Sequence, residues 1–221
     1  MISKEAIKRG YNRGNYTVGA HTRPAWATDI TSSGGAKGMQ VDPVAISEAT
    51  FDRLRVIADE VLMSESDVIT WTRDWWAGSM IAETQGVPAT SKGVIVRVST
   101  VEQIQDVMRL ASESAIPVTV SAGRSNVTGA ALPLRGGIVL DVCELNKFID
   151  FDPQSQIVEV EAGMFGDVFE QIIQKEHGMT MGHWPSSFGI STVGGWVACR
   201  GAGQLSTRYG KIEDMVFGMD V

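Results

Sequence analysis

The chain has 221 residues, 43% hydrophobic and 20% charged, so it can bury its own core as one full domain or two small subdomains. Its formal net charge of −7 argues against nucleic acid as a partner, because phosphate backbones bind to positively charged surfaces. No run approaches the ~20 apolar residues of a membrane span, and the N-terminal residues lack the apolar region of a secretory signal. The two cysteines, Cys143 and Cys199, form no metal-binding pattern, and no metal site is expected. We expect a cytoplasmic protein with reduced thiols.

The first 92 residues are predicted to form an extension. Residues 1 to about 40 show no regular pattern, which indicates an extended arm or a tail that contacts a partner. Residues 43–63 predict a helix, because apolar side chains recur there at helical spacing. The segment 64–92 has no clear pattern but holds Trp71, Trp75 and Trp76. We expect these tryptophans to belong to a core or its cover, with a partner-binding surface as the less favoured alternative.

Regular alternation of strands and helices begins at Gly93. Residues 94–98 predict a buried strand and 117–120 predict another strand, and the helix between them has one apolar face and a capping box at 99–102. This is a β-α-β unit. Residues 137–142 predict a third strand.

The pattern changes again after residue 155. Residues 156–162 alternate between apolar and polar side chains, as in a half-exposed strand. Phe165 to Glu176 predict an amphipathic helix that ends at Gly178, with His177 as a solvated cap. The expected fold class is α+β with mixed sheets.

A first glycine-containing segment, Ser121 to Ala130, follows a predicted strand directly. Successive backbone N–H groups in such a loop can form an anion-binding concavity, to which Ser125, Asn126 and Thr128 would add donors. A diphosphate fits this chemistry, and an ordinary surface turn is an equal alternative. The loop has neither the Walker A pattern nor the Rossmann fingerprint.

A second such segment runs from Pro185 to Gly203. Ser191 or Thr192 is expected to cap a helix, and free N–H groups at a helix start can bind phosphate or lie against a flat ring. From the residues alone, the favoured alternative is a closely packed helix whose glycines permit near approach.

Together, the two segments resemble the FAD-binding domain of the vanillyl-alcohol oxidase/p-cresol methylhydroxylase superfamily. The first is similar to that family's Gly-Gly-Gly-Thr-Ser-Val-x-Gly-Gly loop, with Arg124, Ser125 and Asn126 in place of Gly, Thr and Ser. The stretch 191–197, with Arg200 and 209–216, resembles the alkyldihydroxyacetonephosphate synthase branch. The resemblance covers about 93–221 and implies a PCMH-type FAD-binding domain of two α/β subdomains.

The resemblance also implies which residues bind FAD. Residues 121–127 would hold the diphosphate, 186–192 would lie along the ribityl chain and the isoalloxazine ring, and 199–202 would complete the pocket. The full predicted set is Ser121, Ala122, Gly123, Arg124, Ser125, Asn126, Val127, Thr128, Gly129, Ser186, Ser187, Ile190, Ser191, Thr192, Gly194, Gly195, Cys199, Arg200, Gly201 and Ala202. No catalytic residue is assigned. Ser186 replaces the acidic residue usual in the family.

The predicted function is therefore the FAD-binding portion of a flavin-dependent oxidoreductase or an alkylglycerone-phosphate-synthase-like enzyme. We expect the domain to be incomplete where the chain stops in mid-strand at Val221, and a further C-terminal domain to bind a small-molecule substrate. The alternative is a non-catalytic flavin-binding or assembly subunit that pairs with a partner chain or a second copy. An NAD-dependent enzyme is a weaker alternative. His183, near the second segment, is expected to be structural, and Arg200 either neutralises cofactor charge or forms a surface ion pair.

Overall fold

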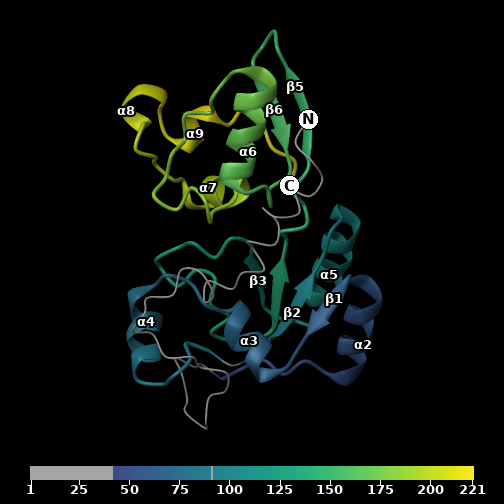
Figure 1. Ribbon diagram of the computed structural model, residues 1–221. Coiled ribbons are helices and arrows are strands. Elements are labelled where there is room, and N and C mark those ends of the chain that lie inside the picture. The colour runs from purple at the N-terminus through teal and green to yellow at the C-terminus, as the bar shows by residue number, and fades with distance from the viewer. Residues whose placement is uncertain (1–41, 91) are drawn as a thin grey trace. The chain divides into compact units, whose positions relative to one another are not determined.

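The computed structural model describes residues 42–90 and 92–221 (Figure 1). The predicted N-terminal arm lies outside the described residues. The described chain divides after Glu144 into a first unit, residues 42–144, and a second unit, Leu145–Val221. The predicted boundary between residues 92 and 93 stays a prediction of sequence organisation.

A four-stranded sheet organises the first unit. Its strands are β1 Glu60–Leu62, β2 Val94–Arg97, β3 Val118–Ser121 and β4 Ile138–Asp141, in the order β1-β2-β4-β3. β2, β4 and β3 are parallel, and β1 pairs antiparallel with β2. The three strands predicted after Gly93 are confirmed, and β4 lies between the two strands of the β-α-β unit.

Four helices accompany this sheet in the described part of the first unit: α2 Glu48–Ile57, α3 Glu65–Trp71, α4 Ala77–Thr84 and α5 Val101–Glu113. The helix predicted over 43–63 is confirmed in its middle but wrong at its end. Ala58 is extended, and the next residues form β1. Pairing with β2 outweighs the helical spacing of the apolar side chains there, because tertiary contacts override local pattern.

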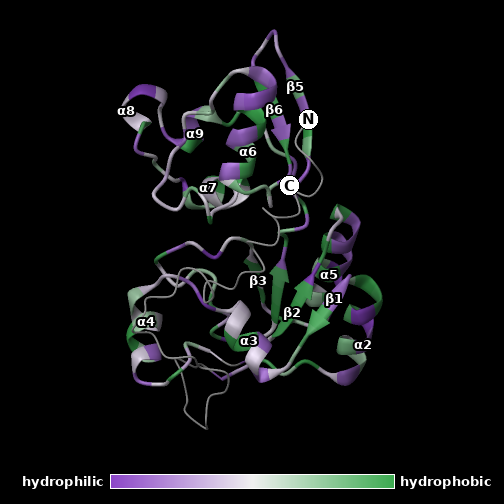
Figure 2. Cartoon of the chain, in the orientation of Figure 1, coloured by the Kyte–Doolittle hydropathy of each residue, from purple (hydrophilic) through white to green (hydrophobic). Residues whose placement is uncertain are grey.

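The core of the first unit lies on both faces of the sheet. Trp71 packs with Ile95 and Val139 on one face. Val96 and Leu140, one residue further along each strand, point to the other face and are also buried. Figure 2 shows β2 and β4 as hydrophobic strands. The expectation that Trp71 belongs to a core is confirmed.

The second unit begins with a hairpin of β5 Phe148–Asp152 and β6 Ile157–Val160. It continues with α6 Gly166–Ile172, the π-helical turn η1 Ile173–His177, and the short helices α7 Val193–Cys199, α8 Ser206–Tyr209 and α9 Ile212–Met215. The strand predicted over 156–162 is confirmed as β6, whereas β5 was not predicted. Residues 216–221 form no strand, contrary to expectation.

The amphipathic helix predicted over 165–176 is confirmed as α6 and η1, and Gly178 ends it with a left-handed φ of 64°. His177 lies in the last turn and is partly exposed, but it also makes ring contacts. Its ring lies 4.0 Å from that of Phe151 and 5.8 Å from that of Phe148, centroid to centroid. The π-helical turn therefore ends with the imidazole packed on the hairpin.

A capping box starts α5, but one residue later than predicted. The Thr100 side chain accepts a hydrogen bond from Gln103 N, and Gln103 Oε1 accepts from Thr100 N and Ser99 N. The sequence offered Ser99 with Glu102 at the same spacing. In the structure, the capping box is formed by Thr100 and Gln103 instead.

Substitution of Thr100 with Ala should lower the free energy of unfolding by about 1 kcal/mol, because loss of the capping hydroxyl leaves an amide of the first turn without its acceptor. Urea denaturation followed by circular dichroism measures this. Ser112→Ala, an exposed change in the same helix, is the control and should stay within about 0.5 kcal/mol. Equal stabilities for the two variants would contradict a role for the box.

Candidate phosphate loop and candidate flavin segment

The candidate phosphate loop, residues 121–130, leaves the sheet where β3 ends at Ser121. The Ser121 carbonyl accepts a hydrogen bond from Val142 N at 3.0 Å, which ties the loop entrance to the end of β4. Arg124 has a φ of 52°, in the left-handed region. Backbone that alternates between right- and left-handed conformations turns successive N–H groups to one side, as in an anion-binding nest.

The hydrogen bonds of this loop leave a run of amides available. Asn126 Oδ1 accepts from Thr128 N at 3.2 Å and from Ala130 N at 3.1 Å, so these two amides are used. Within the described part of the chain, the amides of Gly123, Ser125, Asn126 and Val127 have no acceptor. We call these four N–H groups the amide run. Asn126 shapes the loop through its side-chain oxygen, which therefore serves the loop itself.

The tryptophan segment braces the same loop. Trp75 N donates to the Asn126 carbonyl at 3.0 Å, and Trp76 N donates to Asp74 Oδ1 at 2.9 Å. Burial raises the pKa of Asp74, whereas hydrogen bonds from Trp76, Gly129, Asn126 and Ser79 lower it. Sequence reasoning missed this contribution, since the segment has no periodic pattern.

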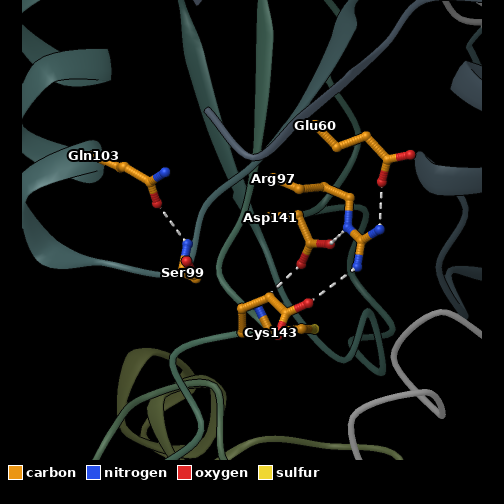
Figure 3. Close-up of polar contacts among 7 residues, drawn as sticks. Glu60, Arg97, Ser99, Gln103, Asp141 and Cys143 are labelled. Carbon is orange, nitrogen blue, oxygen red and sulfur yellow. Dashed lines mark hydrogen bonds and ion pairs between the residues drawn. The ribbon is translucent and has the colours of Figure 1, made fainter. Parts of the chain in front are cut away.

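An ion-pair network closes the carboxyl edge of the sheet beside the loop (Figure 3). Arg97, at the end of β2, lies 3.3 Å from Asp141 at the end of β4, 2.5 Å from Glu60 and 3.6 Å from Glu144. Asp141 also accepts from Cys143 N at 3.0 Å. Burial first, and then the charge of Asp141, raise the pKa of the Cys143 thiol, which keeps it protonated.

The candidate flavin segment, residues 186–202, uses its helix start internally. Thr192 caps α7 by accepting from Gly195 N at 3.3 Å, which confirms the predicted cap. Val193 N donates to the Met164 carbonyl at 2.9 Å, and Gly194 N donates to the Ala162 carbonyl at 2.8 Å. This helix start therefore offers no free N–H group at Val193 or Gly194, and the structure agrees with the closely packed helix that the residues alone favoured.

Ser191 is likewise engaged inside the protein. Its hydroxyl donates to the Ser187 carbonyl at 2.9 Å and accepts from Trp196 Nε1 at 2.6 Å. Phe188 stacks on Trp184 with ring centroids 4.2 Å apart and lies parallel to Trp196 at 6.3 Å. The segment is thus packed through the Ser191 hydroxyl and three aromatic rings.

The remaining predicted residues of this segment differ in exposure. Ser186, Cys199, Arg200 and Ala202 are exposed, whereas Ser187, Ile190, Gly195 and Gly201 are partly buried. Arg200 forms an ion pair with Glu213 at 2.9 Å, and its side chain is 76% exposed. Of the two roles considered for it, the structure therefore shows the surface ion pair.

His183 is buried in the second unit and meets the Trp196 ring edge-on at 4.8 Å. Burial lowers the pKa of its imidazole, so the neutral form is favoured. Neither ring nitrogen has a hydrogen-bond partner among the described residues. The packing against Trp196 supports the expected structural role.

The first half of the predicted site, residues 121–129, thus lies in the first unit, and residues 186–202 lie in the second. Residues 93–221 match a protein family described as FAD binding domain. The chain belongs to this family. The predicted resemblance, the α+β fold and the FAD cofactor are thereby confirmed, whereas the individual contacts to FAD stay predictions.

The relatives of this FAD-binding domain support the predicted branch. The chain is 36% identical over 121 residues to alkyldihydroxyacetonephosphate synthase of Trypanosoma brucei brucei, covering 52% of this chain and 19% of the relative. A solved alkyldihydroxyacetonephosphate synthase matches with a TM-score of 0.74 and 24% identity, covering 96% of this chain and 38% of that one. A solved p-cresol methylhydroxylase matches with a TM-score of 0.60 and 24% identity, covering 73% and 32%. The chain therefore spans between about a fifth and two fifths of these proteins.

The described residues contain neither a membrane-spanning helix nor a group of metal ligands. Across 42–90 and 92–221, no helix is both long and apolar enough to cross a membrane. In the same residues, no three His, Cys, Asp or Glu side chains are grouped as metal ligands.

Substitutions at Gly194 and Gly195 distinguish the effect of close packing from the effect of helix propensity. A Cβ on Gly194 would lie 2.6 Å from that of Ala162, whereas one on Gly195 would meet only Thr192 Oγ1 at 3.1 Å. Gly194→Ala should therefore cost about 1–3 kcal/mol of stability through overpacking. Gly195→Ala, the matched control, should be neutral or stabilising by up to about 1 kcal/mol. Thermal unfolding of both variants measures this, and the reverse order would contradict the packing role.

Proposed function

We propose that the candidate phosphate loop holds the diphosphate of FAD and that the candidate flavin segment lies along the ribityl chain and the isoalloxazine ring. The observation that carries the first assignment is the amide run of residues 123 and 125–127, which has no acceptor among residues 42–90 and 92–221. A diphosphate supplies several acceptor oxygens to such a run. The overall negative charge of the chain does not oppose this, since oriented N–H groups act locally.

The second assignment depends on shape. Because the first amides of α7 are already bonded, we assign residues 186–192 to packing along the flexible part of the cofactor and not to its phosphates. Within this segment, Phe188 stacks on Trp184 and lies parallel to Trp196. Gly195 and residues 199–202 complete the proposed surface, with the exposed Arg200 already paired to Glu213.

We further propose that the whole protein is an FAD-dependent oxidoreductase or an alkylglycerone-phosphate-synthase-like enzyme, as the names of its relatives suggest. Bound FAD would supply the redox chemistry. The residues of this chain would bind and orient it, and a small-molecule substrate would bind elsewhere in the protein. We assign no catalytic residue here. A cytoplasmic location is consistent with two cysteines that form no disulfide, one buried and one exposed.

A second candidate function is a flavin-binding or assembly subunit that needs a partner chain. It is favoured by β3, which lies at the edge of the sheet and carries Val120 with 61% of its surface exposed. Such an edge can pair with another strand. Size-exclusion chromatography with light scattering distinguishes a monomer from a homo-oligomer or a complex.

The purified chain should bind FAD, seen as a yellow chromophore that dithionite bleaches and as quenching of flavin fluorescence. Gly123→Val should weaken this binding by about tenfold or more, because a branched side chain stiffens and crowds the backbone that must approach the diphosphate. Gly218→Val is the control, since a Cβ at Gly218 would meet nothing within 4 Å.

A correctly folded wild-type chain that shows no FAD-dependent signal, even with the remainder of the protein supplied in trans, would contradict the proposal. Equal affinities for wild type and Gly123→Val would show instead that FAD binds elsewhere. Circular dichroism of each variant confirms that lost binding is not lost folding.

A further inference from the structure

Arg124 occupies a backbone conformation that favours glycine. Its φ of 52° lies in the left-handed region, where the Cβ approaches the carbonyl oxygen. Of the residues that the structure describes, three other non-glycine residues share this feature: Ala115, Gln156 and Arg200. Arg124 is the buried one, with 4% of its surface exposed. Some interaction of its side chain must compensate for the unfavourable backbone.

The compensating contact lies beneath the loop. The Arg124 guanidinium carbon is 4.5 Å from the centroid of the Trp71 ring. Arg97 lies over the same ring at 5.2 Å and pairs with Asp141. Stacking on an aromatic face and a nearby carboxylate are the environment that a planar guanidinium favours.

The charge of Arg124 is retained in this position. Burial lowers the pKa of its guanidinium, and the carboxylate of Asp141 raises it. An arginine side chain stays protonated under such opposing effects. Its charge is thus directed at the ring and carboxylate in the core, whereas the amide run on either side of residue 124 belongs to residues that are partly or fully exposed.

We propose that Arg124 is a positioning residue that clamps the candidate phosphate loop onto Trp71 and the carboxyl edge of the sheet. The clamp holds the amide run in its anion-binding arrangement before any ligand is present. The side chain itself is not a phosphate ligand in this proposal. Its consequence for cofactor affinity rests on the proposed function, whereas its consequence for the loop does not.

Two variants test the clamp in the 221-residue chain. Arg124→Gly relieves the backbone and removes the guanidinium, and Arg124→Lys keeps a charge but lacks the planar face. Ala115→Gly is the matched control, because it relieves the same backbone conformation in the same unit without removing a buried side chain. Each is measured without ligand by hydrogen exchange and with FAD by fluorescence titration.

In Arg124→Gly, the hydrogen-bonded loop amides of Thr128 and Ala130 should exchange about tenfold faster without ligand, while peptides from β2 and β4 keep wild-type rates. The Kd for FAD should rise about tenfold, equivalent to about 1.4 kcal/mol. Arg124→Lys should fall between this variant and wild type. Ala115→Gly should match wild type in both measurements.

Wild-type exchange and affinity in Arg124→Gly would overturn the clamp. Equal acceleration in β2 and β4 would also overturn it, since Arg124 would then serve only general stability. If the loop loosens in Arg124→Gly but wild type binds no FAD, the clamp stands and the proposed function fails. The two proposals therefore fail in distinguishable ways.

Discussion

The ion pair between Arg97 and Asp141 is the interaction on which the first unit most depends. Asp141 is 1% exposed, and the Arg97 guanidinium offsets the cost of burying its charge. Removal of one partner from such a pair typically costs about 3–5 kcal/mol. The pair joins the ends of β2 and β4, and Asp141 also fixes the turn that follows through Cys143 N. The edge from which the candidate phosphate loop leaves is therefore held by side chains as well as by the strand ladder.

The backbone amides of the two glycine-containing segments are used in different ways. The first keeps amides open by satisfying only Thr128 and Ala130 through the side chain of Asn126. The second bonds its amides to the turn at 162–164, so Gly194 serves close packing. Two segments that look alike in composition thus have different capacities for an anion. The proposed anion binding is therefore assigned to the first segment, and the second is assigned a packing surface.

The sequence predicted those parts of the fold whose side chains repeat with a clear period. The strands at 94–98 and 137–142 and the helix α6 are examples, because burial on one or both faces selects their residues. β5 was not predicted because its order Phe-Ile-Asp-Phe-Asp breaks strict alternation, and the hairpin has a register shift between Phe148 and Asp150. The strand β1 was taken for helix, since its pairing with β2 depends on residues 33 to 37 positions away along the chain. Asp74 and Trp75 carry no periodic signal at all.

The family match begins at residue 93, but several interactions that support the candidate phosphate loop involve residues before that position. Strand β1, residues 60–62, adds to the sheet by pairing with β2. The Trp71 ring lies in the core, where the guanidinium groups of Arg97 and Arg124 pack on it. Trp75 N donates a hydrogen bond to the Asn126 carbonyl. A sequence profile detects the residues that relatives share, whereas a folding unit is defined by the residues that pack and pair with one another. The amide run therefore depends for its shape on residues that precede the matched region.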